Sequence, residues 1–118
     1  MKLKAVTTWA AIVGCVLVRL RERRSVNQPD LARAVGVAQS TWSRIECGTS
    51  GMSIEQLMLA ATALHVTPAA VLQKASTLRT HLLLQGIQVE PCRSWVKPQG
   101  GLLLSPDQLQ RFAHACNC

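Results

Sequence analysis

Apolar residues recur along the chain at helical spacing and predict a series of short helices. The first helix starts at Thr7 or Thr8, either of which can cap it, and runs to Arg24. Its apolar face consists of Ile12, Val13, Val16, Leu17 and Leu20.

Two further helices are predicted on either side of a tight turn. Asn27 caps the first of them, Asp30 completes a capping box, and Gly36 ends it in a left-handed conformation. The next helix runs from Gln39 to Glu46 and ends at Gly48. Its inward residues are expected to be Trp42 and Ile45, which leaves a polar face outside.

Two more helices follow, and each has a strong start signal. Ser53 pairs with Gln56 as a capping box, and Thr67 precedes Pro68 at a first helical position. The expected apolar stripe of the fourth helix is Ile54, Leu57, Met58, Ala61 and Leu64, and the fifth contributes Val71 and Leu72. Five short helices over residues 7–75 predict a compact helical domain.

The pattern changes after Lys74. Residues 76–85 predict another helix ending at Gly86, residues 87–89 and 102–104 predict two short strands, and residues 107–115 predict a last helix. The aperiodic segment 92–101 is interpreted as a loop. A two-stranded ribbon is marginal alone, so we expect it to pair with a second copy of the chain. Residues 76–118 are therefore predicted to be a small extension used for dimerisation.

Composition narrows the class of partner only a little. The net charge is +7, and residues 1–75 hold nine Lys and Arg against four Asp and Glu. This excess suits a polyanion, although it is common among soluble proteins. Five cysteines, an odd number without regular spacing, do not suggest a disulfide framework and favour a reducing, cytoplasmic location.

The N-terminal segment has a second interpretation. Lys2 and Lys4 precede an apolar run over residues 9–18, which is typical of a signal peptide, and residues 12–15 resemble a lipoprotein cleavage box. Cleavage at Cys15 would cut the first helix in half, and no stretch approaches the ~20 apolar residues of a membrane span. We therefore favour a cytoplasmic protein without a membrane partner.

From about Gly14 to Leu72, roughly half of the chain, the sequence resembles the phage-repressor (Cro/C1, or XRE) type of helix-turn-helix domain. The matching positions agree in register and are Leu20, Arg21, Gln28, Leu31, Ala32, Gly36, Val37, Ser40, Thr41, Ile45, Glu46, Gly48, Ser53, Ile54, Leu57, Ala60, Leu64 and Val66. The resemblance implies a mainly α fold: a five-helix repressor-like domain carrying the small C-terminal α/β extension.

The resemblance also implies which residues meet DNA. Four residues fall on the base-reading positions of that family: Gln39, Ser40, Ser43 and Arg44. Gln can pair with adenine and Arg with guanine through two hydrogen bonds each, whereas serine specifies little. The alternative for Arg44 is a contact with a phosphate or with solvent. Gln28 matches the family's phosphate anchor, and Thr49 and Ser50 are expected to add phosphate contacts.

Arg21 and Glu46 match a pair that forms an internal salt bridge in many relatives. The alternative for Arg21 is an exposed charge in a basic run. The sequence departs from the family pattern at Ala38, Trp42, Cys47 and His65. Ala38 cannot cap the third helix, and Trp42 stands where a small aliphatic residue is usual.

The end of the chain carries a candidate metal or redox site. His114, Cys116 and Cys118, with Cys92, supply soft ligands for zinc or copper, but their spacing is not that of a structural zinc site. Unligated thiols are the favoured interpretation, so we expect neither a metal nor a cofactor. No catalytic motif was found, and we do not expect an enzyme.

Two functions from different classes follow. The first is a sequence-specific DNA-binding transcriptional regulator, most simply a repressor, that binds a pseudo-palindromic operator in double-stranded DNA as a homodimer. The second is a protein-interaction module, such as an antitoxin or inhibitory adaptor, whose residues 76–118 bind a partner protein. The contacts of that partner would be Trp95, residues 102–104 and Phe112.

Overall fold

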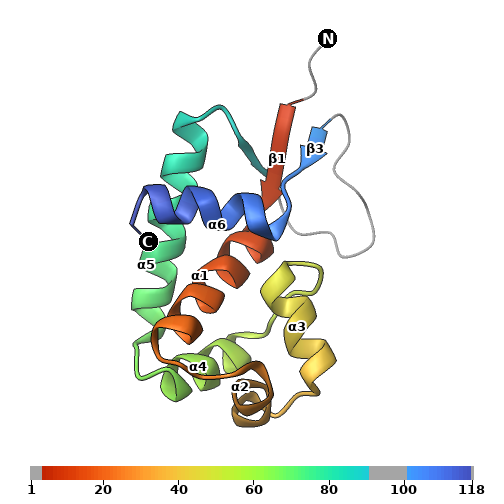
Figure 1. Ribbon diagram of the computed structural model, residues 1–118, viewed down its shortest axis with the longest axis vertical. Helices are drawn as coiled ribbons and strands as arrows, with labels where there is room; N and C mark the ends of the chain where they lie inside the picture. The colour runs from red at the N-terminus through yellow and green to blue at the C-terminus, as the bar shows by residue number, and fades with distance from the viewer. Residues whose placement is uncertain (1–3, 91–100, 118) are drawn as a thin grey trace.

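The computed structural model describes residues 4–90 and 101–117, which form six helices and a small three-stranded sheet at one end of the molecule (Figure 1). In chain order the elements are β1 (Lys4–Thr8), α1 (Trp9–Arg23), α2 (Gln28–Val35), α3 (Gln39–Cys47), α4 (Ile54–Ala63), α5 (Pro68–Leu84), β2 (Gln88–Glu90), β3 (Gly101–Leu103) and α6 (Pro106–Ala115). The prediction of a mainly helical fold is confirmed.

Side-chain caps start five of these helices. The side chains of Thr8, Asn27, Ser53, Thr67 and Ser105 each accept a hydrogen bond from the backbone N–H three residues further on. Ser53 and Gln56 form the full reciprocal capping box. The carboxylate of Asp30 accepts from Arg33 rather than completing the box expected with Asn27. At the start of α3, Ala38 makes no side-chain cap.

The sheet differs from the predicted ribbon. Both β2 and β3 pair in parallel with β1, so the strand order is β2-β1-β3. Ala5 is in register with Leu102, and Thr7 with Val89. The N-terminal strand β1 was not predicted, because it runs directly into α1 and its partner strands lie more than eighty residues further along the chain. Since β1 completes the sheet within one chain, the argument that the ribbon needs a second copy no longer holds.

One continuous helix replaces two predicted ones. α5 runs from Pro68 to Leu84, so the helix expected at residues 76–85 is its second half, and the expected boundary between residues 75 and 76 lies inside it. Leu78 and Leu82 of that half are fully buried, as are Leu109 and Ala113 of α6. α1 lies at the centre of the molecule and contacts α3, α5 and α6 (Figure 1).

The apolar stripe of α4 is rotated from the predicted one. Ala60, Ala61 and Leu64 are buried, whereas Ile54 and Met58 are 76% and 48% exposed. The inward face of α4 follows positions 57, 60, 61 and 64, which places position 54 at its border. Leu72 of α5, also expected in the core, is 51% exposed.

Among the described helices, none by itself combines the length and apolar content of a membrane span.

Candidate nucleic-acid interface

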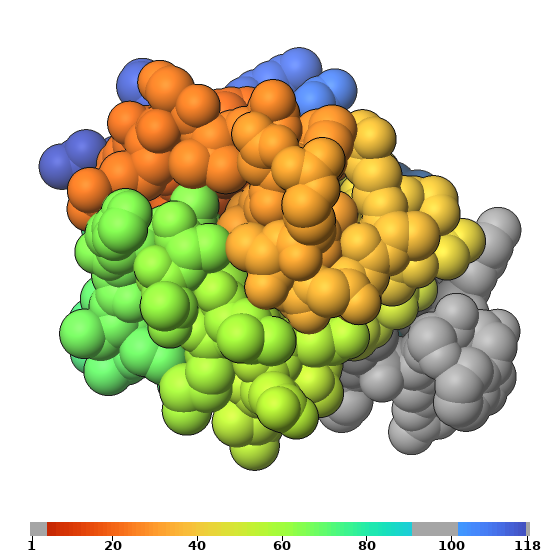
Figure 2. All heavy atoms as spheres, turned by 90° about the horizontal axis from the view of Figure 1, so that it is seen from below, coloured from red at the N-terminus to blue at the C-terminus, as the bar shows by residue number. Residues whose placement is uncertain are grey.

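α3 presents a polar face outward and an apolar face to the core. Gln39, Ser40 and Arg44 are exposed and Ser43 is half-buried, while Trp42 and Ile45 on the opposite face are buried. In Figure 2, α2 and α3 lie next to each other on the surface of the molecule. The four expected base-reading residues therefore share one accessible helix face.

The C-terminal turn of α3 is tied to the loop that follows it. The backbone N–H of Thr49 donates to the carbonyl of Arg44 at 3.0 Å, and its hydroxyl donates to the same oxygen at 3.2 Å. The hydroxyl of Ser50 donates to the carbonyl of Gly51 at 3.4 Å. Both hydroxyls therefore donate within the chain, and a phosphate contact from either side chain requires the hydroxyl to rotate.

A buried carboxylate links α3 to α1 and α2. The Glu46 side chain is 3% exposed, and its Oε2 accepts hydrogen bonds from Arg21 Nε at 2.7 Å and Trp42 Nε1 at 2.8 Å. Its Oε1 accepts from Arg21 Nη2 at 3.2 Å and Gln28 Nε2 at 2.6 Å. Arg21 also donates from Nη1 to the carbonyl of Val26. The expected Arg21–Glu46 ion pair is present, and two further donors satisfy the carboxylate.

Gln28 takes part in this network rather than pointing only to solvent. It is the first residue of α2 and is half-buried, and its side-chain amide donates one hydrogen to Glu46. The amide keeps a second hydrogen, and the backbone N–H of a first helical residue has no partner within the helix. Gln28 thus links the N-terminus of α2, where a phosphate contact is expected, to Glu46 in the last turn of α3.

Two contacts that hold α3 in place were not predicted from the sequence. Trp42 donates to Glu46 across one helical turn, and the spacing of four residues between them was the available signal. Gly14 lies where α1 crosses α3, and a Cβ there would be 2.5 Å from the carbonyl oxygens of Ile45 and Glu46. α1 and α3 therefore approach each other by backbone contact.

The candidate metal site is only partly described. Cys92 and Cys118, like Trp95, lie outside the described residues. His114 is exposed, and the thiol of Cys116 donates to the carbonyl of Ala113. Across residues 4–90 and 101–117, no group of three or more His, Cys, Asp or Glu side chains is placed to hold a metal ion.

Comparison with known proteins identifies a helix-turn-helix domain in the same region of the chain. A family model described as a helix-turn-helix domain matches residues 12–73, which is more than half of the chain. The crystal structure of the clp gene regulator ClgR from Corynebacterium glutamicum is similar, with a TM-score of 0.59 and 28% sequence identity. That similarity covers 65% of this chain and 79% of ClgR. No curated protein matches the sequence.

Proposed function

The chain belongs to the helix-turn-helix domain family, which is part of the Cro/C1 (XRE) group, and from this premise we propose that it is a transcriptional repressor. In this proposal it acts in the cytoplasm, without catalytic activity, and binds a pseudo-palindromic operator as a homodimer. The regulator ClgR, which shares the fold, supports regulation of genes as the function.

The observation that carries the proposal is the fixed, outward polar face of α3. The inward face of α3 is held to the core by buried Trp42 and Ile45 and by the Glu46 network. The outward face keeps four polar side chains accessible: Gln39, Ser40, Ser43 and Arg44. A helix supported in this way fits the major groove of DNA, where Gln39 and Arg44 supply paired hydrogen bonds to base edges.

Contacts with the DNA phosphate backbone are proposed for two segments, the N-terminus of α2 and the loop after α3. The N-terminus of α2 offers the Gln28 amide and backbone N–H to a phosphate, helped by the helix dipole. Thr49 and Ser50 follow Gly48 in the loop after α3, and we propose that they contact a phosphate as well. Such contacts set the position of the domain on DNA, whereas the side chains of α3 set the sequence that it prefers.

Dimerisation is supported by the outer edge of β3. In the described part of the chain, no strand pairs with this edge, and Leu102 and Leu103 are 59% and 54% exposed. The opposite edge strand, β2, carries Gln88 and Glu90, which are the kind of polar residues that discourage strand pairing. Pairing of β3 with its symmetry mate would satisfy the free backbone groups of this edge, cover part of each leucine and close a two-fold dimer.

The proposal is tested by selecting binding sites from random DNA and then measuring affinities of variants. Arg44→Ala should reduce discrimination at one base pair by about 1–3 kcal/mol. Arg33→Ala is the matched control, because Arg33 is an exposed arginine of α2 that pairs with Asp30. Equal loss of discrimination in both variants, or no enriched sequence at moderate salt, would contradict the proposal.

The exposed leucines of β3 also support the second candidate, an antitoxin-like or adaptor protein that binds another protein through residues 76–118. The two candidates differ in oligomeric state. A dimer that dissociates in Leu102→Glu and Leu103→Glu variants favours the repressor. A monomer in sedimentation that also fails the DNA selection favours the interaction module.

A further inference from the structure

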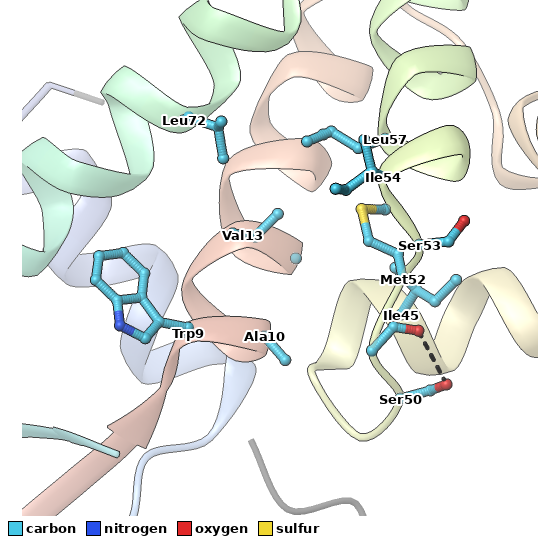
Figure 3. Close-up of a pocket in the computed structure, with 12 residues that line it drawn as sticks. Trp9, Ala10, Val13, Ile45, Ser50, Met52, Ser53, Ile54, Leu57 and Leu72 are labelled. Carbon is cyan, nitrogen blue, oxygen red and sulfur yellow. Dashed lines mark hydrogen bonds between the residues drawn. The ribbon is translucent and has the colours of Figure 1, made fainter. Parts of the chain in front are cut away.

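A cavity of about 250 Å³ opens between α1, α4, α5 and the loop that joins α3 to α4 (Figure 3). In Figure 3, Ala10 and Val13 of α1 point across it toward Met52, Ile54 and Leu57. The described residues that line the cavity carry no charged side chain: Trp9, Ala10, Val13, Gly14, Ile45, Ser50, Gly51, Met52, Ser53, Ile54, Leu57 and Leu72.

The rim of the cavity consists of side chains of the kind that fill protein cores. Ile54, Leu72 and Trp9 are 76%, 51% and 41% exposed. The Arg79 guanidinium lies 5.3 Å from the centre of the Trp9 ring, a cation–π contact that holds the indole at the rim. Large apolar residues therefore surround a space that no described residue of this chain fills.

Depth favours a small molecule over a protein surface as the occupant. The lining reaches Gly14 and Ile45, which are buried where α1 meets α3. A cavity of about 150 Å³ holds benzene, so a volume of about 250 Å³ suits roughly ten non-hydrogen atoms. The absence of charge among the described lining residues indicates an uncharged ligand.

The cavity also borders the elements that carry the proposed DNA contacts. Ile45 belongs to α3, and Ser50 is bound through its backbone N–H to the carbonyl of Arg44 at 3.3 Å. A ligand that contacts Ile45 and Ser50 therefore touches both α3 and the loop expected at the phosphates. Ligand and DNA would then affect each other's affinity through this shared wall.

We propose that this cavity binds a small, uncharged, mainly apolar molecule, and that its occupancy changes the affinity of the protein for its operator. The first part stands independently of the function proposed above, whereas the second part rests on it.

Binding is tested without DNA by nuclear magnetic resonance titration of the full chain with two probes, indole and 1-hexanol. We expect saturable shifts of the backbone amides of Val13, Ile54, Leu57 and Leu72. Ile54→Ser should weaken binding about tenfold, because it removes an apolar wall. Leu59→Ser is the matched control, since Leu59 is exposed on the same helix but does not line the cavity, and it should leave affinity unchanged.

A second pair of variants fills the cavity mouth instead of opening it. Leu72→Trp should weaken binding of both probes, whereas Leu83→Trp, at a similarly exposed position of α5 outside the cavity, should not. All four positions are exposed, so the variants are expected to fold. Failure of both probes to saturate, or equal effects within either pair, overturns the proposed site.

The last measurement separates this inference from the proposed function. Saturating probe should change the affinity for a selected operator about fivefold or more, and Ile54→Ser should abolish the change while Leu59→Ser keeps it. Bound probe without such a change overturns the coupling. Absence of any DNA binding contradicts the repressor and leaves the titration result intact. Protein-concentration-dependent shifts of the same amides without probe identify a second copy as the occupant and overturn the small-molecule site.

Discussion

At the scale of single residues, the Glu46 carboxylate has the most consequences for how α3 is held. Its two oxygens accept four hydrogen bonds from Arg21, Trp42 and Gln28. Burial of a charge is tolerated only when such partners satisfy it. The orientation of α3 relative to α1 and α2 is thereby linked to one side chain.

Removal of that carboxylate should be costly. Glu46→Ala leaves the mostly buried Arg21 guanidinium without its counter-ion, and we expect a loss of about 3–5 kcal/mol in the free energy of unfolding. The control is Asp30→Ala, which breaks an exposed ion pair with Arg33 and should cost about 1 kcal/mol or less. Urea unfolding measures both. Similar losses would show that the Glu46 pair is not effectively buried.

Two adjacent threonines should respond in opposite directions to the same change. The Thr7 hydroxyl is buried and has no hydrogen-bond partner among the described residues, so Thr7→Val should stabilise the protein by about 1 kcal/mol. The Thr8 hydroxyl caps α1 by accepting from Ala11, so Thr8→Val should destabilise it by about 1 kcal/mol. Thermal unfolding of the pair checks the sign, and a destabilised Thr7→Val variant would contradict the prediction.

At the scale of elements, α3 is supported by direct backbone contact with α1. The absence of a side chain at Gly14 lets α1 approach the carbonyl groups of Ile45 and Glu46. Gly48, which ends α3 with φ of +79°, packs in the same way against Ala11. The position of the C-terminal half of α3 is therefore set both by the Glu46 network and by the close approach that the two glycines allow.

Gly14→Ala should push these helices apart. The new Cβ would meet backbone oxygens that cannot move aside as flexible side chains do, and we expect a loss of about 1–3 kcal/mol in stability together with weaker operator binding. Gly51→Ala is the control, because a Cβ there meets nothing within 4 Å and the residue does not need a positive φ. Unfolding and DNA-affinity measurements on both variants test this prediction, and equal effects of Gly14→Ala and Gly51→Ala would contradict it.

The elements that sequence predicted well are those with short-range signals. Thr8, Asn27, Ser53 and Thr67 cap helices through bonds that span three residues, and the local sequence reveals such bonds. β1 was missed because its partners lie more than eighty residues away. Ile54 and Leu72 were expected in the core from their periodicity, and they instead line a cavity whose existence depends on how three helices meet.

The candidate site likewise has features that the sequence predicted and features that depend on how the helices pack. The exposed face of α3 and the Arg21–Glu46 pair could be expected from the pattern of residues and the family resemblance. The bonds from Trp42 and Gln28 to Glu46 depend on the packing angles of α2 and α3, and no local pattern fixes those angles. The base contacts themselves remain predictions.

At the scale of the whole molecule, the C-terminal residues are packed into the same core as the helices that carry the interface. Leu78 and Leu82 of α5 and Leu109 of α6 are buried with Ile12 and Leu17 of α1 in one cluster. We therefore expect residues 76–118 to unfold together with residues 7–75 rather than as a separate domain.

A matched pair on α5 tests this expectation. Leu78→Ala should lower the free energy of unfolding by about 2–5 kcal/mol for the entire chain, because Leu78 is fully buried. Leu84→Ala, at 79% exposed, should change it by less than about 0.5 kcal/mol. Fluorescence and circular dichroism should report coincident transitions. Two separate transitions, with residues 7–75 unaffected by Leu78→Ala, would instead support two domains that meet between residues 75 and 76.

The position of β1 at the centre of the sheet has a consequence for how the protein forms during synthesis. β1 leaves the ribosome long before β2 and β3 are made, and it has neither strand partner until β2 has emerged. The contacts that join α2 to α3 and α4, and α3 to α1, link segments that lie closer in the sequence and can form earlier. Closure of the sheet is thus expected to be the slow, late event of folding, and the nascent chain carries β1 as an unpaired strand until residues 88–90 have been added.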